Sequence, residues 1–283
     1  MAKITSLAEL TDVASDDLLV VVDKSDTSMS DSGTDKKVQK VNLLKGLVPE
    51  NGWIPAGETW TYASADSPTF TFTISGDKTS KYSVGMKIKL TQTTVKYFII
   101  TAISYSSPNT TVTVYGGTDY TLANATITNP YYSTMKAPQG FPMNPDKWSV
   151  VTIDSTARRK NSPAPGTWYY SDIGSINISI PIGLWDLTFS CLVTIYTPSG
   201  VNQKIVAALS TSQTSSSDGQ LRSAVGGQNP VEFMAEINCR KVLDIATKTS
   251  YYAILKTDNG GVGFIEYTNN LKNLIIRATC AYL

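Results

Sequence analysis

Residues 70–74 read Phe70-Thr-Phe-Thr-Ile74, a run in which large apolar and small hydroxyl side chains alternate. Successive side chains of a β-strand point to opposite faces, so this alternation predicts a strand with one buried face. Similar apolar runs recur along the chain between turn-forming Gly, Pro and Asn residues. Ser and Thr are abundant while Glu and Leu are sparse, which suits strands better than helices. The sequence therefore predicts an all-β fold.

Three regions of the chain differ in pattern and define the expected domains. Residues 1–48 contain one strong apolar run, Leu18-Leu-Val-Val-Val22, and are too few for a stable core of their own. Residues 52–140 predict hairpin-connected strands, and we expect an antiparallel β-barrel there. Residues 146–283 predict roughly eight strands with turns between them, which is typical of a jelly-roll β-sandwich. We expect a linker between the last two regions at Gly140-Phe-Pro-Met-Asn-Pro145.

The predicted strands are short apolar or alternating runs, and Thr93-Thr94 is the expected turn of one hairpin. Ser212–Gln228 is expected to be a long loop and Asp258–Gly263 a turn. The strands are expected at residues 18–22, 36–41, 70–74, 87–92, 95–100, 111–115, 175–180, 184–196, 204–210, 231–239, 251–256, 262–267 and 271–282.

Several function classes are disfavoured by composition. The chain has no histidine, which removes the commonest general base and the commonest metal ligand. Cys191, Cys239 and Cys280 are far apart, and we expect them to be buried as small apolar groups. A formal charge of +1 gives no electrostatic reason to expect nucleic acid. No apolar run reaches the roughly 20 residues that span a bilayer, and we see no signal peptide. We therefore expect no enzyme activity, metal, cofactor, nucleic-acid partner or membrane insertion.

One enzymatic alternative stays open, a short glycan-degrading spike. Such an enzyme needs two carboxylates about 5–10 Å apart. Glu232 and Glu236 are the candidate carboxylate pair. On a strand, however, their spacing of four residues would place them about 13 Å apart. Carboxylates from different strands would have to converge instead.

The N-terminal region contains a specific order of short sequence runs. The order Ile4-Thr-Ser-Leu7, Asp17-Leu-Leu-Val-Val-Val-Asp23, Thr34-Asp-Lys-Lys-Val38 and Val41-Asn-Leu-Leu44 resembles the N-terminal segment of tailed-bacteriophage fibre proteins. In that family the segment attaches the protein to the virion. The resemblance implies attachment through Ile4, Leu7, Leu18, Leu19, Val20, Val21, Val22, Val38, Val41, Leu43 and Leu44.

Two further resemblances concern the other regions. Residues 52–65, 87–98 and 120–133 are similar to a small β-domain of phage virion proteins. The last run, residues 274–283, is similar to the final strand of trimeric jelly rolls such as the C1q and tumour-necrosis-factor families. In those families the strand lies near the three-fold axis, and a homotrimer is the expectation from the architecture of fibre proteins.

The expected function is that of a structural virion protein of a tailed phage, a tail fibre or receptor-binding protein that attaches the particle to its host. It would be made in the bacterial cytoplasm and located in the virion. A head fibre, capsid decoration or collar protein is the alternative. Expected partners are further copies of itself, other virion proteins, and a host surface glycan or protein. Aromatic rings stack on sugars and surface loops present polar contacts, so the candidate receptor contacts are Trp168, Tyr169, Tyr170, Arg222 and Asn259.

Overall fold

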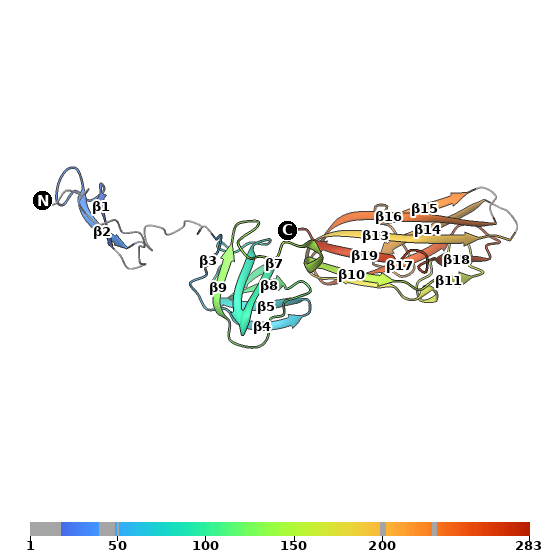
Figure 1. Ribbon diagram of the computed structural model, residues 1–283, viewed down its shortest axis with the longest axis horizontal. Coiled ribbons are helices and arrows are strands. Elements are labelled where there is room, and N and C mark those ends of the chain that lie inside the picture. Colours follow the sequence, from blue (N-terminus) through green and yellow to red (C-terminus); the bar gives the residue numbers. More distant parts are fainter. Residues whose placement is uncertain (1–17, 40–48, 50, 199–201, 228–230) are drawn as a thin grey trace. The chain divides into compact units, whose positions relative to one another are not determined.

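The computed structural model describes residues 18–39, 49, 51–198, 202–227 and 231–283. The chain divides into two compact units, Met1–Glu50 and Asn51–Leu283 (Figure 1). Within the described ranges every regular element is a β-strand except two short 3-10 helices, η2 (Pro145–Trp148) and η3 (Ser171–Ile173). The prediction of an all-β fold is confirmed.

The first unit contains an antiparallel hairpin of β1 (Leu18–Asp23) and β2 (Thr34–Gln39). Its connection ends at Gly33, whose φ of +120° favours glycine. A Cβ at Gly33 would lie 2.7 Å from Val22 Cγ1 and 2.8 Å from the Asp23 carbonyl oxygen. Gly33 therefore allows the chain to turn back closely against β1. A hairpin of two strands is marginally stable in water unless another surface covers it.

The middle region forms one seven-stranded antiparallel sheet in the order β3-β9-β6-β7-β8-β5-β4. The predicted hairpin at Thr93 is confirmed, because Thr93 alone separates β6 from β7 and has a φ of +62°. The strands are β3 (Ile54–Pro55), β4 (Thr61–Asp66), β5 (Thr69–Ser75), β6 (Lys87–Gln92), β7 (Thr94–Ser106), β8 (Asn109–Tyr115) and β9 (Thr128–Ser133).

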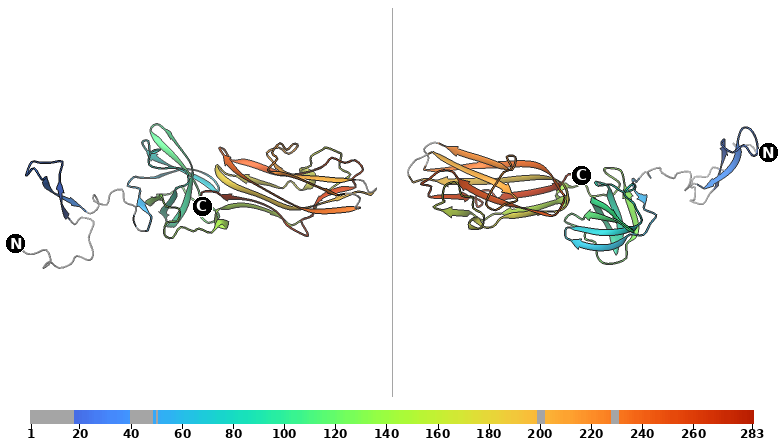
Figure 2. Two further views of the ribbon diagram at one scale, coloured as in Figure 1. Left: turned by 90° about the horizontal axis from the view of Figure 1, so that it is seen from above. Right: turned by 180° about the vertical axis from the view of Figure 1, so that it is seen from behind.

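The middle sheet curves around an aromatic core (Figure 2). Trp60 is stacked on Phe72 with ring centroids 4.5 Å apart, and Tyr82 meets Trp60 edge-on at 5.9 Å. The sheet is open, because β3 pairs only with β9 and β4 only with β5 among residues 51–140. The prediction of a barrel is therefore wrong. These large rings, with smaller apolar side chains, fill the concave face without closure.

The C-terminal region is a sandwich of two antiparallel sheets. Sheet I contains β16, β13, β19, β18, β10 and β11, and sheet II has the order β12-β17-β14-β15. The strands are β10 (Ser149–Asp154), β11 (Arg158–Asn161), β12 (Asn177–Ile180), β13 (Gly183–Tyr196), β14 (Gln203–Ser210), β15 (Arg222–Gly227), β16 (Glu232–Ile245), β17 (Thr249–Thr257), β18 (Phe264–Tyr267) and β19 (Leu274–Cys280).

The order of these strands is that of a jelly roll, as predicted. β10 and β11 pair with β19 and β18, which both lie along one edge of β13, while β16 pairs with its other edge. We therefore treat β10 with β11 as one interrupted first strand, and β18 with β19 as one interrupted last strand. Sheet I then has the order 1-8-3-6 and sheet II the order 2-7-4-5, which is the jelly-roll arrangement.

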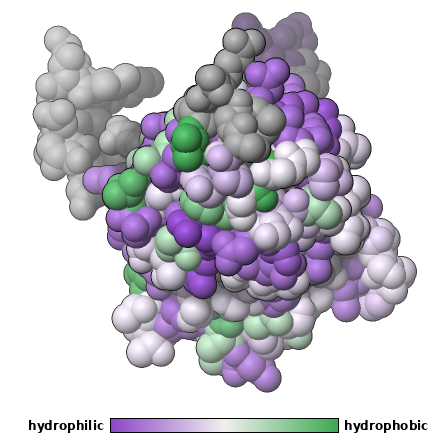
Figure 3. Space-filling model, turned by 90° about the vertical axis from the view of Figure 1, so that its right-hand side faces the viewer, coloured by the Kyte–Doolittle hydropathy of each residue, from purple (hydrophilic) through white to green (hydrophobic). Residues whose placement is uncertain are grey.

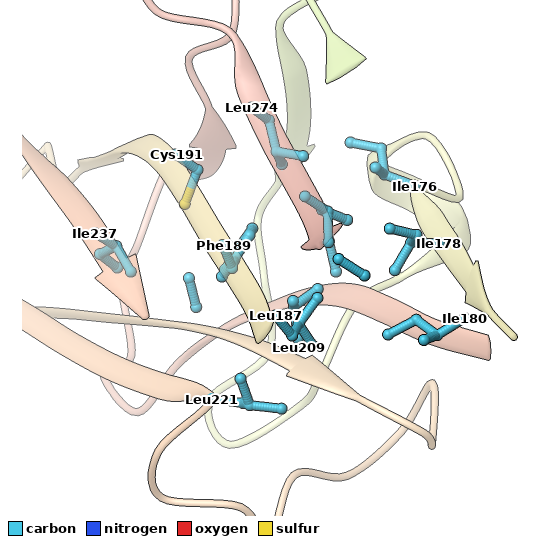
Figure 4. Packing of buried hydrophobic residues seen from close by; sticks show 14 of the residues in the cluster. Ile176, Ile178, Ile180, Leu187, Phe189, Cys191, Leu209, Leu221, Ile237 and Leu274 are labelled. Atoms are coloured by element: carbon cyan, nitrogen blue, oxygen red, sulfur yellow. The ribbon is translucent and has the colours of Figure 1, made fainter. Parts of the chain in front are cut away.

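The core of the sandwich comes from the inward-facing residues of both sheets. Leu187, Phe189 and Cys191 alternate with outward residues along β13, and Ile178 and Leu209 meet them from sheet II (Figure 4). All three cysteines are free thiols; Cys191 and Cys280 are buried, as predicted, and Cys239 is half-buried. The core is mainly aliphatic, and aromatic rings form a smaller share of it than of the core of the middle sheet.

Aromatic residues connect the middle sheet to the sandwich inside the second unit. Tyr115 of β8 lies 4.9 Å from Trp185 of β13, ring centroid to ring centroid. Phe141 is stacked on Trp148 at 4.9 Å, and Trp148 Nε1 donates to the Pro142 carbonyl at 2.6 Å. The connection expected as a linker is therefore packed into the larger hydrophobic cluster.

A buried lysine adds a polar contact at the same junction. Lys87 on β6 is 2% exposed, and its Nζ donates to the carbonyl oxygens of Gly85 at 3.1 Å and Tyr282 at 2.5 Å. Burial lowers the pKa of Lys87. The middle sheet thus contacts the last residues of the sandwich through both apolar and polar groups.

Candidate binding surfaces

The β1–β2 hairpin contains the described part of the predicted attachment segment. Val20 and Val22 share one face of β1 and are 76% and 56% exposed. Val21 and Val38 are half-buried on the opposite face. A small sheet that exposes two valines side by side is a surface suited to docking on another protein.

The other predicted attachment residues lie in β1 or outside the described part of the chain. Leu18 and Leu19 are the first two residues of β1. The others lie outside the described residues; they are Ile4, Leu7, Val41, Leu43 and Leu44.

The acidic side chains Asp23 and Asp26 have hydrogen-bond or ion-pair partners within the hairpin. Asp26 forms an ion pair with Lys36 at 2.5 Å and accepts from the Ser28 N–H at 3.0 Å. The hydrogen bond from Lys36 is the main reason why the pKa of Asp26 lies well below its usual range. Asp23 accepts from both the N–H and the hydroxyl of Ser25. Among the described residues no group of three potential metal ligands occurs.

The outer face of sheet II gathers three aromatic side chains. Tyr169 forms a bridge with Leu255 of β17 and points into the core, so its neighbours Trp168 and Tyr170 point outward. Tyr170 meets Tyr252 of β17 edge-on with centroids 4.9 Å apart. Trp168 and Tyr170 are both half-buried. The structure thus places two of the three predicted aromatic contacts on one face.

Tyr169 has a different environment from its two neighbours. It is 8% exposed, and its hydroxyl accepts from the Ala164 N–H at 2.7 Å. Its ring packs in the sandwich core and leaves little surface for a ligand.

The Trp168 ring lies beside a lysine that belongs to a small group of ion pairs. Lys256 Nζ lies 5.3 Å from the centroid of a Trp168 ring and 2.6 Å from an oxygen of Asp258. Lys204 binds the other Asp258 oxygen at 2.9 Å. Hydrogen bonds from Lys256 and then Lys204 lower the pKa of Asp258. A ring with ammonium and carboxylate groups beside it can contact both the apolar and the hydroxyl faces of a sugar.

Arg222 and Asn259 lie at different positions along sheet II. Arg222 is the first residue of β15, opposite Ala208, so the predicted loop Ser212–Gln228 in fact contains a strand. Asn259 follows β17, whose Thr257 is opposite Ile205. Ala208 and Ile205 are three residues apart on β14, which separates them by about 10 Å along the strand. The structure therefore places Asn259 near the Lys256–Asp258 end of sheet II and Arg222 away from it.

The end of the sandwich that faces the viewer in Figure 3 is mostly hydrophilic, with scattered hydrophobic residues. The described residues that follow the ends of β13 and β17 lie there, including Asp258–Gly263. Asn259 is half-buried, and its Oδ1 is buried without a hydrogen-bond partner.

Sequence reasoning did not single out Tyr252, Lys256 or Lys204 as contacts. All three lie within predicted strands. Only the bridge of Tyr169 to β17 brings Lys256 beside Trp168 and Tyr252 beside Tyr170, and Lys204 reaches this group through its ion pair with Asp258. The alternation of β17 would have indicated that Tyr252 and Lys256 share a face, but not which residues lie next to them.

The carboxylate pair considered for hydrolysis lies on one strand. Glu232 and Glu236 are exposed residues of β16, on its outward face. Glu236 accepts from Asn238 Nδ2 at 2.8 Å and pairs with Lys272, which is the main cause of its lowered pKa. Their spacing along β16 remains about 13 Å.

No helix in the described part of the chain is long and apolar enough to cross a membrane.

Comparisons with known proteins give distant structural likenesses. No protein-family model matches the chain, and no curated protein matches it. A solved structure of dimeric latent PorU from Porphyromonas gingivalis aligns with 80% of this chain at 8% identity and a TM-score of 0.26. The alignment covers only 24% of the PorU chain.

Two further likenesses are similarly distant. The structure of infectious bursal disease virus, Gx strain, aligns over 89% of this chain and 67% of its own at 13% identity and a TM-score of 0.27. The tandem CBM22-1–CBM22-2 domains of Paenibacillus barcinonensis Xyn10C align over 96% and 99% at 10% identity and a TM-score of 0.22. At these TM-scores the likenesses carry no argument about function.

Proposed function

We propose that this chain is a structural virion protein of a tailed phage, a tail fibre or receptor-binding protein that attaches the particle to its host. The observation that carries the proposal is the exposed Val20–Val22 face of the N-terminal hairpin, which belongs to a unit separate from the sandwich. A two-stranded sheet with uncovered valines needs a partner surface. The resemblance of the same residues to the attachment segment of phage fibres supports a virion protein as that partner.

Attachment to the host is proposed to occur through the sandwich without any bond being made or broken. The candidate contact is Trp168 with Tyr170, flanked by Lys256 and Asp258 on the outer face of sheet II. Several copies on one particle would gain avidity from weak individual contacts. We propose a homo-oligomer, with a trimer as the expected number.

Immunogold labelling of particles of the encoding phage tests the proposal. Label at the tail, together with inhibition of adsorption by the purified chain, is the expected result. Label on the capsid or collar would favour a head fibre or decoration protein instead. Particles that bind no antibody would exclude a virion role.

The contact surface is tested by binding of the purified chain to host cells or their polysaccharide. Trp168→Ala removes the ring beside Lys256, and we expect binding to fall about five- to thirtyfold, since stacking contributes on the order of 1–2 kcal/mol. Tyr105→Ala is the matched control, because Tyr105 is an exposed aromatic residue of the middle sheet. Equal loss in both variants, or in neither, would contradict this assignment.

A further inference from the structure

The two outer faces of the sandwich differ in their exposed apolar residues. In the described part of the sandwich, every large apolar side chain that is strongly exposed belongs to sheet I or to a segment that adjoins its strands. These residues are Val151 (38%), Ile153 (58%), Val231 (55%), Met234 (48%), Val242 (56%) and Leu271 (66%). On sheet II the outward apolar residues Val206, Ala208 and Ile254 are buried, so other parts of the chain already cover these side chains.

The apolar residues of sheet I occupy two opposite margins of one face. Val151 and Ile153 of β10 pair with Arg277 and Ile275 of β19, and these share the outer face with them. At the other margin Met234 and Val242 lie on β16, opposite the outward residues of β13. Each margin is small by itself, but the two lie on one continuous sheet surface.

The charged groups between these margins are paired within the chain. Arg240 binds both carboxylate oxygens of Asp186, at 2.8 and 2.6 Å. Three further ion pairs neutralise other charged residues on the outer face of sheet I; they are Lys272 with Glu236, Arg277 with Asp146, and Arg159 with Glu266. Glu232 and Asp244 lie at the two ends of β16. A second copy brought against this face would therefore meet no unpaired charge between the two margins.

The size of this face matches what a stable interface needs. β13 has 14 residues, and at about 3.3 Å per residue it is about 46 Å long. Four columns of strands about 4.8 Å apart give a width of about 19 Å, and hence roughly 900 Å². A standard interface buries about 800 Å² on each partner.

We propose that the outer face of sheet I binds a second copy of this chain, with the β10 margin of one copy against the β16 margin of the other. This inference rests on the proposed role as an oligomeric virion component and assigns the surface that the oligomer uses. The contact buries Val151 and Ile153 of one copy beside Met234 and Val242 of the next. It leaves Trp168 and Tyr170, on sheet II, free for a host ligand.

The test is the mass of the purified full-length chain in solution, measured by light scattering. We expect a discrete multiple of 30.6 kDa. Ile153→Arg and Val242→Arg each place a charge in one margin, and each should shift the mass to that of one chain. Both residues are more than half exposed, so the fold should tolerate either arginine, and circular dichroism with the melting temperature confirms this.

Ala224→Arg, at an exposed position on β15 of sheet II, is the matched control and should leave the mass unchanged. A monomeric unmodified chain would overturn the inference, and so would an oligomer that survives both margin variants. A mass that falls for only one margin variant would overturn the pairing of the two margins. Particle labelling decides the virion role independently, so failure of one proposal is distinguishable from failure of the other.

Discussion

The middle sheet and the C-terminal sandwich bury their cores in two different ways. The middle sheet is a single curved layer that packs large rings, Trp60, Phe72 and Tyr82, against its own concave face. The sandwich instead closes two layers over smaller side chains such as Leu187 and Ile178. A single sheet has no opposite layer to fill its core, so a few residues of large volume must do so. Stability should therefore depend on fewer residues in the middle sheet than in the sandwich.

The largest expected effect comes from Trp60→Ala. Trp60 is 2% exposed and touches both Phe72 and Tyr82, so its removal leaves a large cavity with no second layer to collapse into it. We expect the free energy of unfolding to fall by about 3–5 kcal/mol. Urea denaturation followed by circular dichroism measures this change. A loss below that of Leu187→Ala, measured in the same way, would contradict the contrast between the two cores.

A pH effect of intermediate size is expected at Cys280, close to the junction of the two regions. Cys280 lies opposite Trp185 in sheet I and is 1% exposed. Burial raises the pKa of its thiol from 9.0 to about 11. The folded chain then holds this proton over a range in which the unfolded chain has released it. The resulting stability is complete below pH 9 and is lost as the pH rises towards 11.

The measurement compares the unmodified chain with Cys280→Ala at pH 8.5 and at pH 11. Other groups titrate in this range, but their effect is common to both proteins. The unmodified chain should lose about 2–3 kcal/mol more than the variant between the two pH values. Parallel losses would mean that the thiol ionises equally easily in the folded state.

The smallest effect is expected inside the sandwich, at Ile178→Val. Ile178 is buried on β12 but is one of many aliphatic contributors to the core. Removal of one methyl group should lower the free energy of unfolding by about 0.5–1.5 kcal/mol. The same urea assay applies, and a loss comparable to that of Trp60→Ala would remove the distinction between a distributed and a concentrated core.

Much of the fold could be predicted from local pattern. The run expected at residues 184–196 is β13 (Gly183–Tyr196), and the run at 70–74 lies inside β5. β15 was missed because Arg222–Gly227 contains two glycines and little apolar alternation. The prediction of a barrel for residues 52–140 is wrong because local pattern indicates the strands but not whether the first and last of them pair.

The arrangement of the candidate contact residues likewise depends on strand pairing, which the local sequence pattern does not give. Trp168, Tyr169 and Tyr170 look alike in the sequence, yet the bridge of Tyr169 to Leu255 turns one ring inward and two outward. Arg222 and Asn259 were both expected in surface segments, but strand register separates them along β14. Such distinctions depend on pairing between residues far apart in sequence.

The pairing of β10 with β19 has a consequence for the order in which the chain folds. Ser149 is opposite Thr279, so this contact closes a loop of well over a hundred residues. Closing such a loop costs conformational entropy that grows with the logarithm of its length, and contacts of this kind slow folding. The hairpins of the middle sheet join strands that are neighbours in sequence and can form while synthesis continues. Sheet I cannot be completed until residue 280 has left the ribosome, and until then the edge of β13 that pairs with β18 and β19 stays unpaired, which favours aggregation.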